Sequence, residues 1–401
     1  MGEVNSKPLM ASVVVNNYNY GRFLADAIDS ALAQTYAPLD VVVVDDGSTD
    51  ESRDIIASYG DRIVPVLKEN GGQGSALNAG FAASRGDIVV FLDSDDLLLP
   101  TAVERAVPCF DDPRVVKAYW QLWEVDADRK LLGDLIPRRS LPEGEVHEEV
   151  LRFGPSAIVE TPTSGNAWSR RFLERVLPMP EREFRINSDC YLSTLAPIYG
   201  TVRTVAEPQS HYRVHGDNRY VLMTVGEKSK RHFDLYLQRC DLLARHCQLL
   251  DIAADPDSWK DGNWSFDYLE KVWITSEEIA QVVPKGHSFI LLDDGKWGDG
   301  RAGTEAVSGR VSIPFLEHNG AYYGRPADDA AAIRELERVR AEQTPDFLVV
   351  VWLGFWWLEY YTGFAAHLRT SYRCVVENER IVIYDLTPRS EGEGRGDAKR
   401  G

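Results

Sequence analysis

The sequence predicts an α/β protein that begins with a mostly parallel sheet flanked by helices. Over the first hundred residues, short β-branched runs alternate with segments whose apolar residues recur at the helical period. Residues 41–44 are four consecutive valines, which is typical of a parallel strand covered on both faces. Each apolar run also ends in polar residues. Repeated strand–helix units of this kind favour a parallel sheet with right-handed crossovers.

In the first hundred residues, the expected strands and helices alternate regularly. The second strand ends in Asp45-Asp46-Gly47-Ser48, so that Ser48 or Thr49 can cap the next helix. Gly71-Gly72 predicts a loop before the third helix. The expected elements are strands at 12–15, 40–44, 63–67 and 88–92, and helices at 21–34, from the cap to 57, and at 75–84.

Beyond residue 100 the pattern is less regular, and a second α/β pattern begins after Pro284-Lys285-Gly286. Residues 137–165 are rich in Pro, Gly and Glu and predict loops near a site. The other expected elements are strands at 115–123, 202–212, 287–292, 309–315, 346–352, 373–377 and 380–386, and helices at 170–176, 188–199, 231–254, 264–282, 327–342 and 355–369. We therefore expect a first domain at 1–220, a helical connector at 221–284, a smaller Rossmann-like α/β domain at 285–388, and a disordered polar tail at 389–401.

Composition excludes several classes of function. The 401 residues carry 62 acidic and 44 basic side chains, a net charge of −18, which disfavours nucleic acid and anionic lipid as partners. The five cysteines form no CxxC pair, so neither a zinc site nor a disulfide framework is expected. The most apolar stretch, residues 347–358, is shorter than the about 20 residues of a membrane-spanning helix. We expect a cytoplasmic protein without signal peptide or transmembrane segment, whose membrane association would have to be peripheral.

The sharpest chemical signal is Asp93-Ser94-Asp95 at the end of the fourth strand. Two carboxylates one residue apart on a turn can face one divalent cation, which prefers hard oxygen ligands. Such a cation would stabilise a nucleotide diphosphate as a leaving group. The same residues also suit a turn that caps the next helix, so the motif alone leaves both interpretations open. Asp45-Asp46 end the strand two strand–helix units earlier, and Asn16 and Tyr18 end the first strand. Polar residues therefore converge on the sheet edge where ligands of parallel sheets bind.

Four segments of the chain carry a resemblance to a known family. They read, in order, VVVNNYNYGRFLADAIDSALAQTY, VVVVDDGSTDES, NGGQGSALNAGFAASRGDIVVFLDSDD and PTSGNAWSRRFL. In this order and at these spacings, the chain resembles the inverting family 2 glycosyltransferases over roughly residues 10–220. The resemblance implies a GT-A fold, a nucleotide-diphosphate sugar donor, and Mn²⁺ or Mg²⁺ as cofactor.

The resemblance also implies roles for individual residues. Asp46 matches the carboxylate that accepts the N3–H of a uracil-type base, which favours a UDP- or dTDP-sugar. Asp93 and Asp95 match the metal-binding DxD pair, and Asp189 matches the general base that deprotonates the acceptor. A lone Asp before a helix is also a common cap. The asparagine pair at the first strand's end departs from the small residue, Pro or Thr usual in the family. Further implied positions are Asn16, Tyr18, Gly72, Asn78 and Ser94 in the nucleotide pocket, and Ser164, Gly165 and Asn166 in a loop that closes on the donor sugar.

Residues 211–218, HYRVHGDN, form the next polar cluster. Similar Tyr-Arg-x-His segments follow the catalytic helix in the family, so the resemblance implies His215 as a third metal ligand. Imidazole suits Mn²⁺ better than Mg²⁺. Arg213 could instead pair with the diphosphate. A surface loop with a helix-capping Asp217 is the alternative interpretation.

The C-terminal pattern implies no activity. Asp293-Asp294-Gly295 follows a strand and residues 298–303 are glycine-rich, but no GxGxxG is present. The aromatic cluster between Trp352 and Tyr361 is typical of a core or an interface, which leaves a homodimer open, and a carbohydrate-stacking platform is the less common alternative. The segment resembles uncharacterised domains appended to bacterial glycosyltransferases.

We therefore predict a metal-dependent inverting glycosyltransferase that moves a sugar from a UDP- or dTDP-sugar to a hydroxyl of a carbohydrate, lipid-linked or natural-product acceptor. Three alternatives compete with this prediction. A nucleotidyltransferase would carry a Gly-rich loop with a basic residue near its N-terminus, which this sequence lacks. A bifunctional enzyme would place a second activity in the C-terminal domain. A non-catalytic sugar- or nucleotide-binding scaffold would use the same fold without turnover. The sequence names neither the sugar nor the acceptor.

Overall fold

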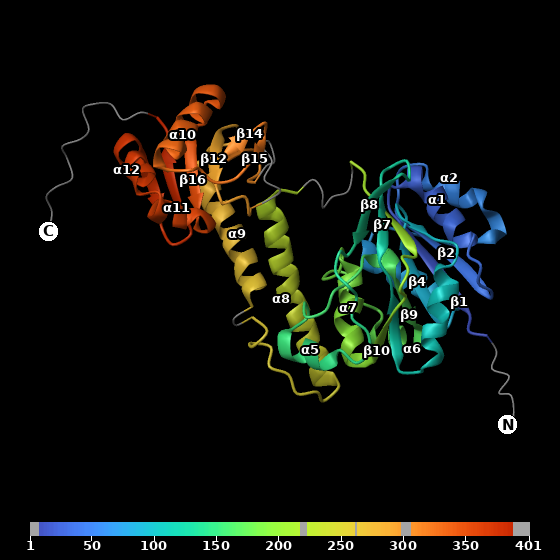
Figure 1. Ribbon diagram of the computed structural model, residues 1–401. Coiled ribbons are helices and arrows are strands. Elements are labelled where there is room, and N and C mark those ends of the chain that lie inside the picture. Colours follow the sequence, from blue (N-terminus) through green and yellow to red (C-terminus); the bar gives the residue numbers. More distant parts are fainter. Residues whose placement is uncertain (1–7, 217–222, 261–262, 298–305, 388–401) are drawn as a thin grey trace. The chain divides into compact units, whose positions relative to one another are not determined.

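The computed structural model describes residues 8–216, 223–260, 263–297 and 306–387, and is drawn in Figure 1. The chain divides into two compact units, an N-terminal unit of Met1–Asn218 with Tyr236–Asn263 and a C-terminal unit of Arg219–Leu235 with Trp264–Gly401. The residues expected to form a connector are thus shared between the two units. The expected tail at 389–401 and the glycine-rich loop at 298–303 lie outside the described residues.

The N-terminal unit is built on a seven-stranded sheet with the strand order β10-β6-β9-β4-β1-β2-β3. All neighbouring strands are parallel except β9, which runs antiparallel to both β4 and β6. The strands are β1 (Ala11–Asn17), β2 (Leu39–Asp46), β3 (Val64–Lys68), β4 (Ile88–Asp93), β6 (Val115–Tyr119), β9 (Asn166–Ser169) and β10 (Thr201–Thr204). The mostly parallel, helix-flanked sheet expected from the sequence is confirmed.

The core of this unit lies between the valine-rich strands and the helices that connect them. Val13, Val43 and Val90 are fully covered, and they pack with Leu24 and Ile28 of the first helix. Burial on both faces explains why β1, β2 and β4 are continuous apolar runs. The helices of the unit are α1 (Gly21–Leu32), α2 (Ser52–Ser58), α3 (Gln73–Ala83), α4 (Ala102–Ala106), α5 (His147–Phe153), α6 (Arg170–Val176) and α7 (Ser188–Tyr199), with 3₁₀ turns at Gly60–Arg62, Val107–Asp111 and Thr163–Gly165.

Two segments expected as single strands are each divided between two sheets. Residues 115–123 form β6 and the start of β7 (Leu122–Val125), and residues 202–212 form β10 and β11 (Ser210–Arg213). The second sheet has the order β5-β11-β7-β8, with β5 at Leu97–Leu98 and β8 at Leu131–Ile136. Trp120 marks the change of sheet, because its indole N–H donates to Ser210 Oγ (2.8 Å) and its backbone N–H donates to Gly165 O (3.0 Å).

The C-terminal unit contains a five-stranded sheet with the order β13-β12-β16-β18-β17. Strands β12, β13 and β16 are parallel, and β18 and β17 continue the sheet antiparallel. Helix α9 covers one face, while α10 and α12 cover the other. The elements are α9 (Trp264–Val282), β12 (Ser288–Leu292), β13 (Val311–Pro314), β14 (Glu317–His318), β15 (Ala321–Tyr322), α10 (Asp329–Gln343), β16 (Phe347–Val351), a 3₁₀ turn (Trp352–Gly354), α11 (Phe355–Tyr360), α12 (Thr362–Ser371), β17 (Arg373–Glu377) and β18 (Ile381–Asp385).

Two helices differ from their expected bounds. The helix expected at 355–369 is interrupted at Tyr361, which has the non-helical angles φ −91° and ψ 72° and separates α11 from α12. Helix α8 (Val225–Leu249) begins six residues before its expected start, and its residues are divided between the two units.

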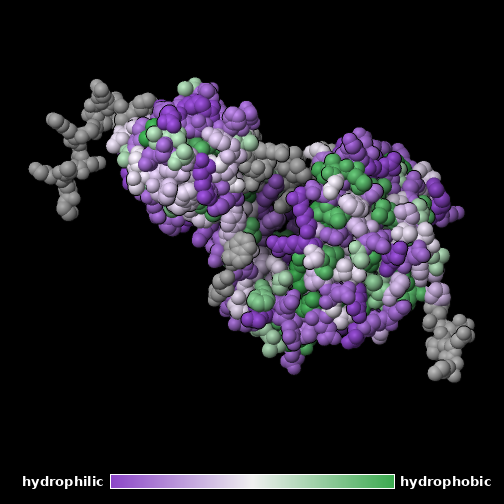
Figure 2. All heavy atoms as spheres, in the orientation of Figure 1, coloured by the Kyte–Doolittle hydropathy of each residue, from purple (hydrophilic) through white to green (hydrophobic). Residues whose placement is uncertain are grey.

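The molecular surface is mainly polar on the face drawn in Figure 2, where hydrophobic side chains form separate small patches. None of the helices described here is long and apolar enough to cross a membrane.

Gly86 tests the packing of the central sheet. A Cβ at this position would lie 2.4 Å from the backbone N of Ser12 and 2.7 Å from the carbonyl oxygen of Ile88. We expect Gly86→Ala to lower the free energy of unfolding by about 1–3 kcal/mol, because backbone on both sides must shift. Gly216→Ala is the control, since its Cβ would meet nothing within 4 Å. Urea unfolding of both variants checks this, and equal stabilities would contradict the expectation.

Candidate active site

The carboxyl ends of β1, β2 and β4 bring polar side chains from distant parts of the sequence together. The register pairs Asn16 with Asp93 and Asn17 with Asp45. Nδ2 of Asn16 donates to Asp93 Oδ1 (2.9 Å) and to the carbonyl of Leu92 (3.1 Å). The asparagine pair at the end of β1 therefore ties the two neighbouring strand ends together.

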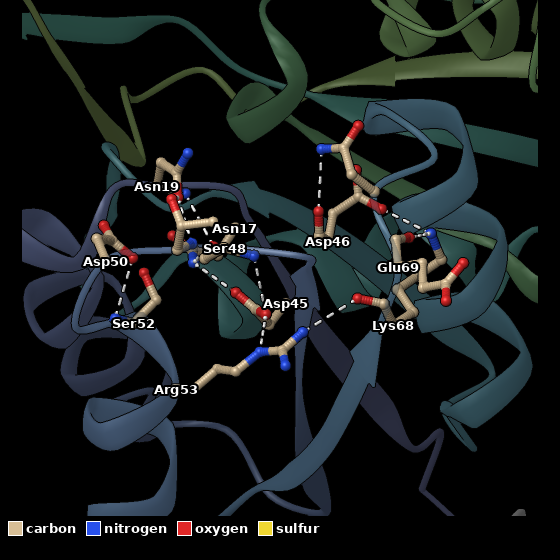
Figure 3. A network of polar contacts seen from close by, with 12 residues as sticks. Asn17, Asn19, Asp45, Asp46, Ser48, Asp50, Ser52, Arg53, Lys68 and Glu69 are labelled. Atoms are coloured by element: carbon tan, nitrogen blue, oxygen red, sulfur yellow. Dashed lines mark hydrogen bonds and ion pairs between the residues drawn. The ribbon is translucent and has the colours of Figure 1, made fainter.

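Asp45 is the fully buried centre of the network in Figure 3. Its carboxylate accepts hydrogen bonds from Asn17 Nδ2 (3.3 Å), Ser48 N (3.2 Å) and Arg53 Nε (2.8 Å). Burial raises the pKa of Asp45, but the hydrogen bonds from Ser48 and Arg53 outweigh it, and the net pKa is lowered. Asp45 is thus a charged structural anchor for the loop after β2.

Asp46 holds the loop that begins α3. Its Oδ1 accepts from Lys68 Nζ (2.6 Å) and Gly71 N (2.9 Å), and its Oδ2 accepts from Gly72 N (2.7 Å). Gly72 has φ +93°, and a Cβ there would lie 2.6 Å from the carbonyl oxygen of Arg185. Only glycine fits this conformation and this close approach without strain. Asp46 and Gly72, both expected at the nucleotide pocket, are therefore neighbours at one edge of the site.

Gln73 joins three elements of the site, and motif reasoning did not single it out. Its Nε2 donates to Asp93 Oδ1 (3.1 Å) and Thr163 Oγ1 (3.3 Å), while its Oε1 accepts from Ser188 N (3.3 Å). The side chain thus connects the acidic end of β4 with the first turn of α7. Its position directly after Gly71-Gly72, at the start of α3, is the sequence signal that could have identified it.

The side chains of Arg213 and Asp96 hold the acidic turn, residues 93–96, in place. Arg213 is 2% exposed and donates to Asp96 Oδ1 through its backbone N–H (3.0 Å) and to Asp95 O through Nε (2.8 Å). Its two terminal nitrogens donate to Ala127 O (2.8 Å) and Asp26 Oδ2 (3.0 Å). Asp96 Oδ2 accepts from Ser164 Oγ (2.6 Å). Arg213 is therefore used to hold the turn.

His215 lies beside the same turn. Its Nε2 is 3.2 Å from Asp95 Oδ2, and its Nδ1 is 3.3 Å from a terminal nitrogen of Arg22. The ring packs against Tyr20 and Phe23, with centroid distances of 5.4 and 4.8 Å. The resemblance implied Asp95 and His215 as metal ligands, and the two side chains are in direct contact.

Burial and neighbouring charges raise the pKa values of carboxyl groups in the acidic turn. Burial and the neighbouring charge of Asp95 raise the pKa of Asp93 to about 7, and Asp189 adds to the effect. Burial also raises the pKa of Asp96 well above its usual range. Among the described residues, no three Asp, Glu, His or Cys side chains form a group that would hold a metal ion by themselves. The donor chemistry of Asp93 and Asp95 nevertheless fits Mg²⁺ or Mn²⁺, which commonly bind one or two carboxylates plus substrate phosphates.

Asp189 stands in the first turn of α7. The preceding Asn187 adopts the left-handed conformation with φ 61°, and Asp189 Oδ1 accepts from Cys190 N (3.0 Å). Burial raises the pKa of Asp189, whereas Arg239 and Lys117 oppose this shift. A carboxylate with a raised pKa in a largely covered site suits proton transfer.

Two buried cations lie next to α7. Lys117 is 1% exposed, donates to Ser193 Oγ (3.0 Å), and has its ammonium 4.5 Å from the Tyr119 ring centroid. Arg239 donates to Thr194 Oγ1 (2.7 Å) and forms an ion pair with Glu160. Both contacts fall one turn beyond Asp189, so they set the position of the helix that carries it.

The other expected site residues have mainly structural contacts. The side-chain amide of Asn78 forms two hydrogen bonds with the backbone of Met179: Nδ2 donates to the carbonyl oxygen (3.0 Å), and Oδ1 accepts from the N–H (2.9 Å). The amide nitrogen of Asn166 donates to Pro162 O (2.7 Å), which shapes the turn at Ser164 and Gly165. Ser94 donates its backbone N–H to Asn16 O (3.1 Å), and Tyr18 is 47% exposed.

A cavity of about 600 Å³ lies at the opposite edge of the large sheet, near the amino ends of β6 and β10. Arg171 and Arg175 line it, but Arg171 donates to Pro113 O (3.1 Å) and Arg175 lies over the Tyr199 ring, 4.4 Å from its centroid. None of the residues expected in the active site lines this cavity.

Residues 12–150 match the sequence profile of Glycosyl transferase family 2. An uncharacterised glycosyltransferase of Nostoc sp. is 38% identical over 214 residues, which cover 52% of this chain and 66% of that protein. An uncharacterised glycosyltransferase of Rickettsia prowazekii is 44% identical over 98 residues, covering 24% of this chain and 31% of that protein. The chain thus spans two thirds or less of the length of these relatives. The N-terminal unit of the chain thus contains a glycosyltransferase family 2 domain.

Comparison with solved structures gives matches of lower similarity. Staphylococcus aureus TarS residues 1–349 in complex with UDP align with a TM-score of 0.46 and 16% identity, over 69% of this chain and 76% of that one. A mannosyltransferase of Pyrobaculum calidifontis in complex with GDP-Man and Mn²⁺ aligns with a TM-score of 0.44 and 19% identity, over 70% of this chain and 77% of that one.

The buried Lys117 predicts a specific pH dependence of stability. Burial lowers the pKa of Lys117 from 10.5 to about 8. Between pH 8 and 10.5 the unfolded chain therefore binds more protons than the folded chain, and the free energy of unfolding rises with pH. Relative to Lys117→Met, the wild-type protein should gain up to about 3 kcal/mol across this window. Urea titrations at several pH values measure this difference.

The difference between the two proteins should stay constant below pH 7, where Lys117 is protonated in both states, and this range is the internal control. A difference that is equally constant between pH 8 and 10.5 would contradict the pKa shift.

Proposed function

We propose that the N-terminal unit is a metal-dependent inverting glycosyltransferase that uses a nucleoside-diphosphate sugar. One observation carries the proposal. The acidic turn at Asp93 and Asp95 is joined through Gln73 to the first turn of α7, which holds Asp189. A diphosphate-binding group and a candidate general base thus share one site at the ligand-binding edge of a parallel sheet.

Asp93 and Asp95 would hold the cation, with His215 beside Asp95. When bound, Mn²⁺ or Mg²⁺ supplies positive charge that stabilises the departing diphosphate. The electrostatics of the chain support this assignment, because burial and the neighbouring charge of Asp95 together raise the pKa of Asp93 to about 7. Asn16 and Gln73 hold Asp93 Oδ1 in place, and Arg213 fixes the backbone of Asp95.

Asp46 would recognise the base of the nucleotide. Its Oδ1 accepts two hydrogen bonds and its Oδ2 accepts one among the described residues, so Oδ2 keeps a lone pair for another donor. The N3–H of uracil or thymine supplies such a donor, which favours a UDP- or dTDP-sugar. Lys68 adds a positive charge at the same carboxylate.

Asp189 would remove the proton of the acceptor hydroxyl as its oxygen attacks the anomeric carbon. The attack occurs on the face opposite the leaving diphosphate and inverts the anomeric configuration, so that an α-linked donor gives a β-linked product. Lys117 and Arg239 hold α7 in position through hydrogen bonds. Their positive charges also reduce the rise in the pKa of Asp189 that burial causes. The acceptor class that we propose is a carbohydrate, a lipid-linked sugar or a natural product bearing a hydroxyl.

A thermal-shift screen with UDP, dTDP, GDP, CDP and ADP, each with Mn²⁺ or EDTA, tests the donor site. A nucleotide at 100 times its Kd stabilises the folded protein by about 2.7 kcal/mol, which moves Tm measurably. We expect Mn²⁺-dependent stabilisation by UDP or dTDP that is lost in Asp95→Ala. Asp128→Ala, on an exposed turn, is the control variant. Selective stabilisation by GDP would contradict the role of Asp46, and no response to any diphosphate would contradict the donor site.

Asp189→Asn tests the general base. The amide keeps the size of the side chain but cannot accept the proton, so we expect kcat to fall about 10²–10⁴-fold while nucleotide binding is retained. Donor hydrolysis and transfer to a panel of sugar acceptors provide the readout, and the Asp189→Glu variant shows whether a displaced carboxylate restores activity. An Asp189→Asn variant as active as the wild type would exclude Asp189 as the base.

A further inference from the structure

The topology of the C-terminal unit creates its own ligand-binding edge. The chain leaves β12 toward β13 on one side, whereas β16 lies on the other side of β12 and leads to β17 at the far edge of the sheet. The loops after β12 and β16 therefore depart in opposite directions. In open α/β sheets such a switch point, outside the carboxyl ends of the two strands, is where ligands bind.

Charged and aromatic residues from three segments meet at this edge. Asp294 follows β12, Arg325 lies after the β14–β15 hairpin, and Trp356 lies on α11 after β16. Gly354 allows the close approach of these segments, since a Cβ there would lie 2.5 Å from Leu292 O at the end of β12. The Tyr361 hydroxyl also donates to Pro326 O (2.8 Å), beside Arg325.

The guanidinium of Arg325 is held in one orientation. Its Nε and one terminal nitrogen donate to the two carboxylate oxygens of Asp294 (2.9 and 2.7 Å), and its plane lies over the Trp356 ring, 4.6 Å from the centroid. Tyr322 also donates to Asp294 (3.2 Å). Asp294 is 2% exposed while Arg325 is 57% exposed. No acceptor among the described residues meets the second terminal nitrogen of Arg325, which leaves preorganised donors at the surface.

An exposed aromatic ring contacts the same Trp356 ring over which this guanidinium lies. Tyr360 is 73% exposed, and its ring centroid lies 6.2 Å from that of Trp356 and 4.9 Å from that of Tyr361. The ring is supported from within by two partly or fully covered aromatic side chains. An exposed ring with such support is a surface on which an apolar face of a ligand can stack.

The charges of the cluster favour a neutral ligand. The carboxylates of Asp293 and Asp294 balance Lys296 and Arg325, which lies in a bidentate pair with Asp294. A phosphate or carboxylate would therefore meet no net positive charge. A sugar presents hydroxyl groups that accept from the guanidinium and C–H faces that pack on an aromatic ring.

We propose that the C-terminal unit is a carbohydrate-binding module whose site is formed by Arg325 and Tyr360, with Asp294 and Trp356 as positioning residues. Its ligand class is a neutral oligosaccharide. The site is independent of the catalytic role proposed for the N-terminal unit, because it needs no turnover and contains none of the residues of that site.

Binding of the full chain to maltohexaose, chitohexaose and xylohexaose, measured by saturation-transfer difference NMR and titration, tests the proposal. We expect one or more of these probes to bind and Arg325→Ala and Tyr360→Ala each to weaken binding about tenfold or more. Tyr323→Ala is the matched control, since Tyr323 is a 55% exposed tyrosine of the same unit whose ring contact is with His318. Thermal unfolding of each variant confirms that it is folded.

Asp189→Asn separates this site from the N-terminal one, and we expect it to bind the probes like the wild type. Three results would overturn the proposal. The first is no binding of any probe by the wild-type protein at 10 mM, a concentration that detects even weak, about millimolar, affinity. The second is binding that survives Arg325→Ala and Tyr360→Ala. The third is binding of ADP or NAD that is lost in Arg325→Ala, which would indicate a nucleotide site instead.

Discussion

The parallel pairing of β1 with β2 on one side and β4 on the other is the constraint on which the N-terminal site depends. This register sets Asn16 against Asp93 and Asn17 against Asp45. Because the apolar residues of all three strands are buried on both faces of the sheet, a slip by one residue would mismatch the packed core side chains and separate the paired polar residues. The hydrophobic core and the arrangement of the candidate active site are therefore specified by the same pairing.

Several charged side chains are buried near these strands, where a core formed only for stability would contain apolar residues. Asp96 and Arg213 are almost fully covered, as are Lys117 and Arg239. Each has hydrogen-bonding partners, which reduces but does not remove the cost of taking an ion out of water. The charges gather under the acidic turn and beside α7, where they hold Asp95 and Asp189 in position.

The sequence predicted the regular parts well because their signals are local. Continuous apolar runs identified β2 and β4, and the polar residues after them lie at the same edge of the sheet. Gln73 was missed because its role depends on contacts with Thr163 and Ser188, which lie about 90 and 115 residues away. The change of sheet at Trp120 was missed for the same reason, since its hydrogen bond to Ser210 is not visible in the local pattern.

The sequence by itself determined the class of fold, the order of strands and helices from β1 to β4, and the likeness to glycosyltransferase family 2, because periodicity and motif spacing are properties of the chain. Tertiary structure alone decided which polar residues act together. It placed Arg213 beneath the acidic turn as a support, directed Asn78 to the backbone of Met179, and brought Arg325 of the C-terminal unit between Asp294 and Trp356. The physical reason is that side-chain hydrogen bonds, ion pairs and ring contacts need distances of a few ångströms, and only the folded chain sets these.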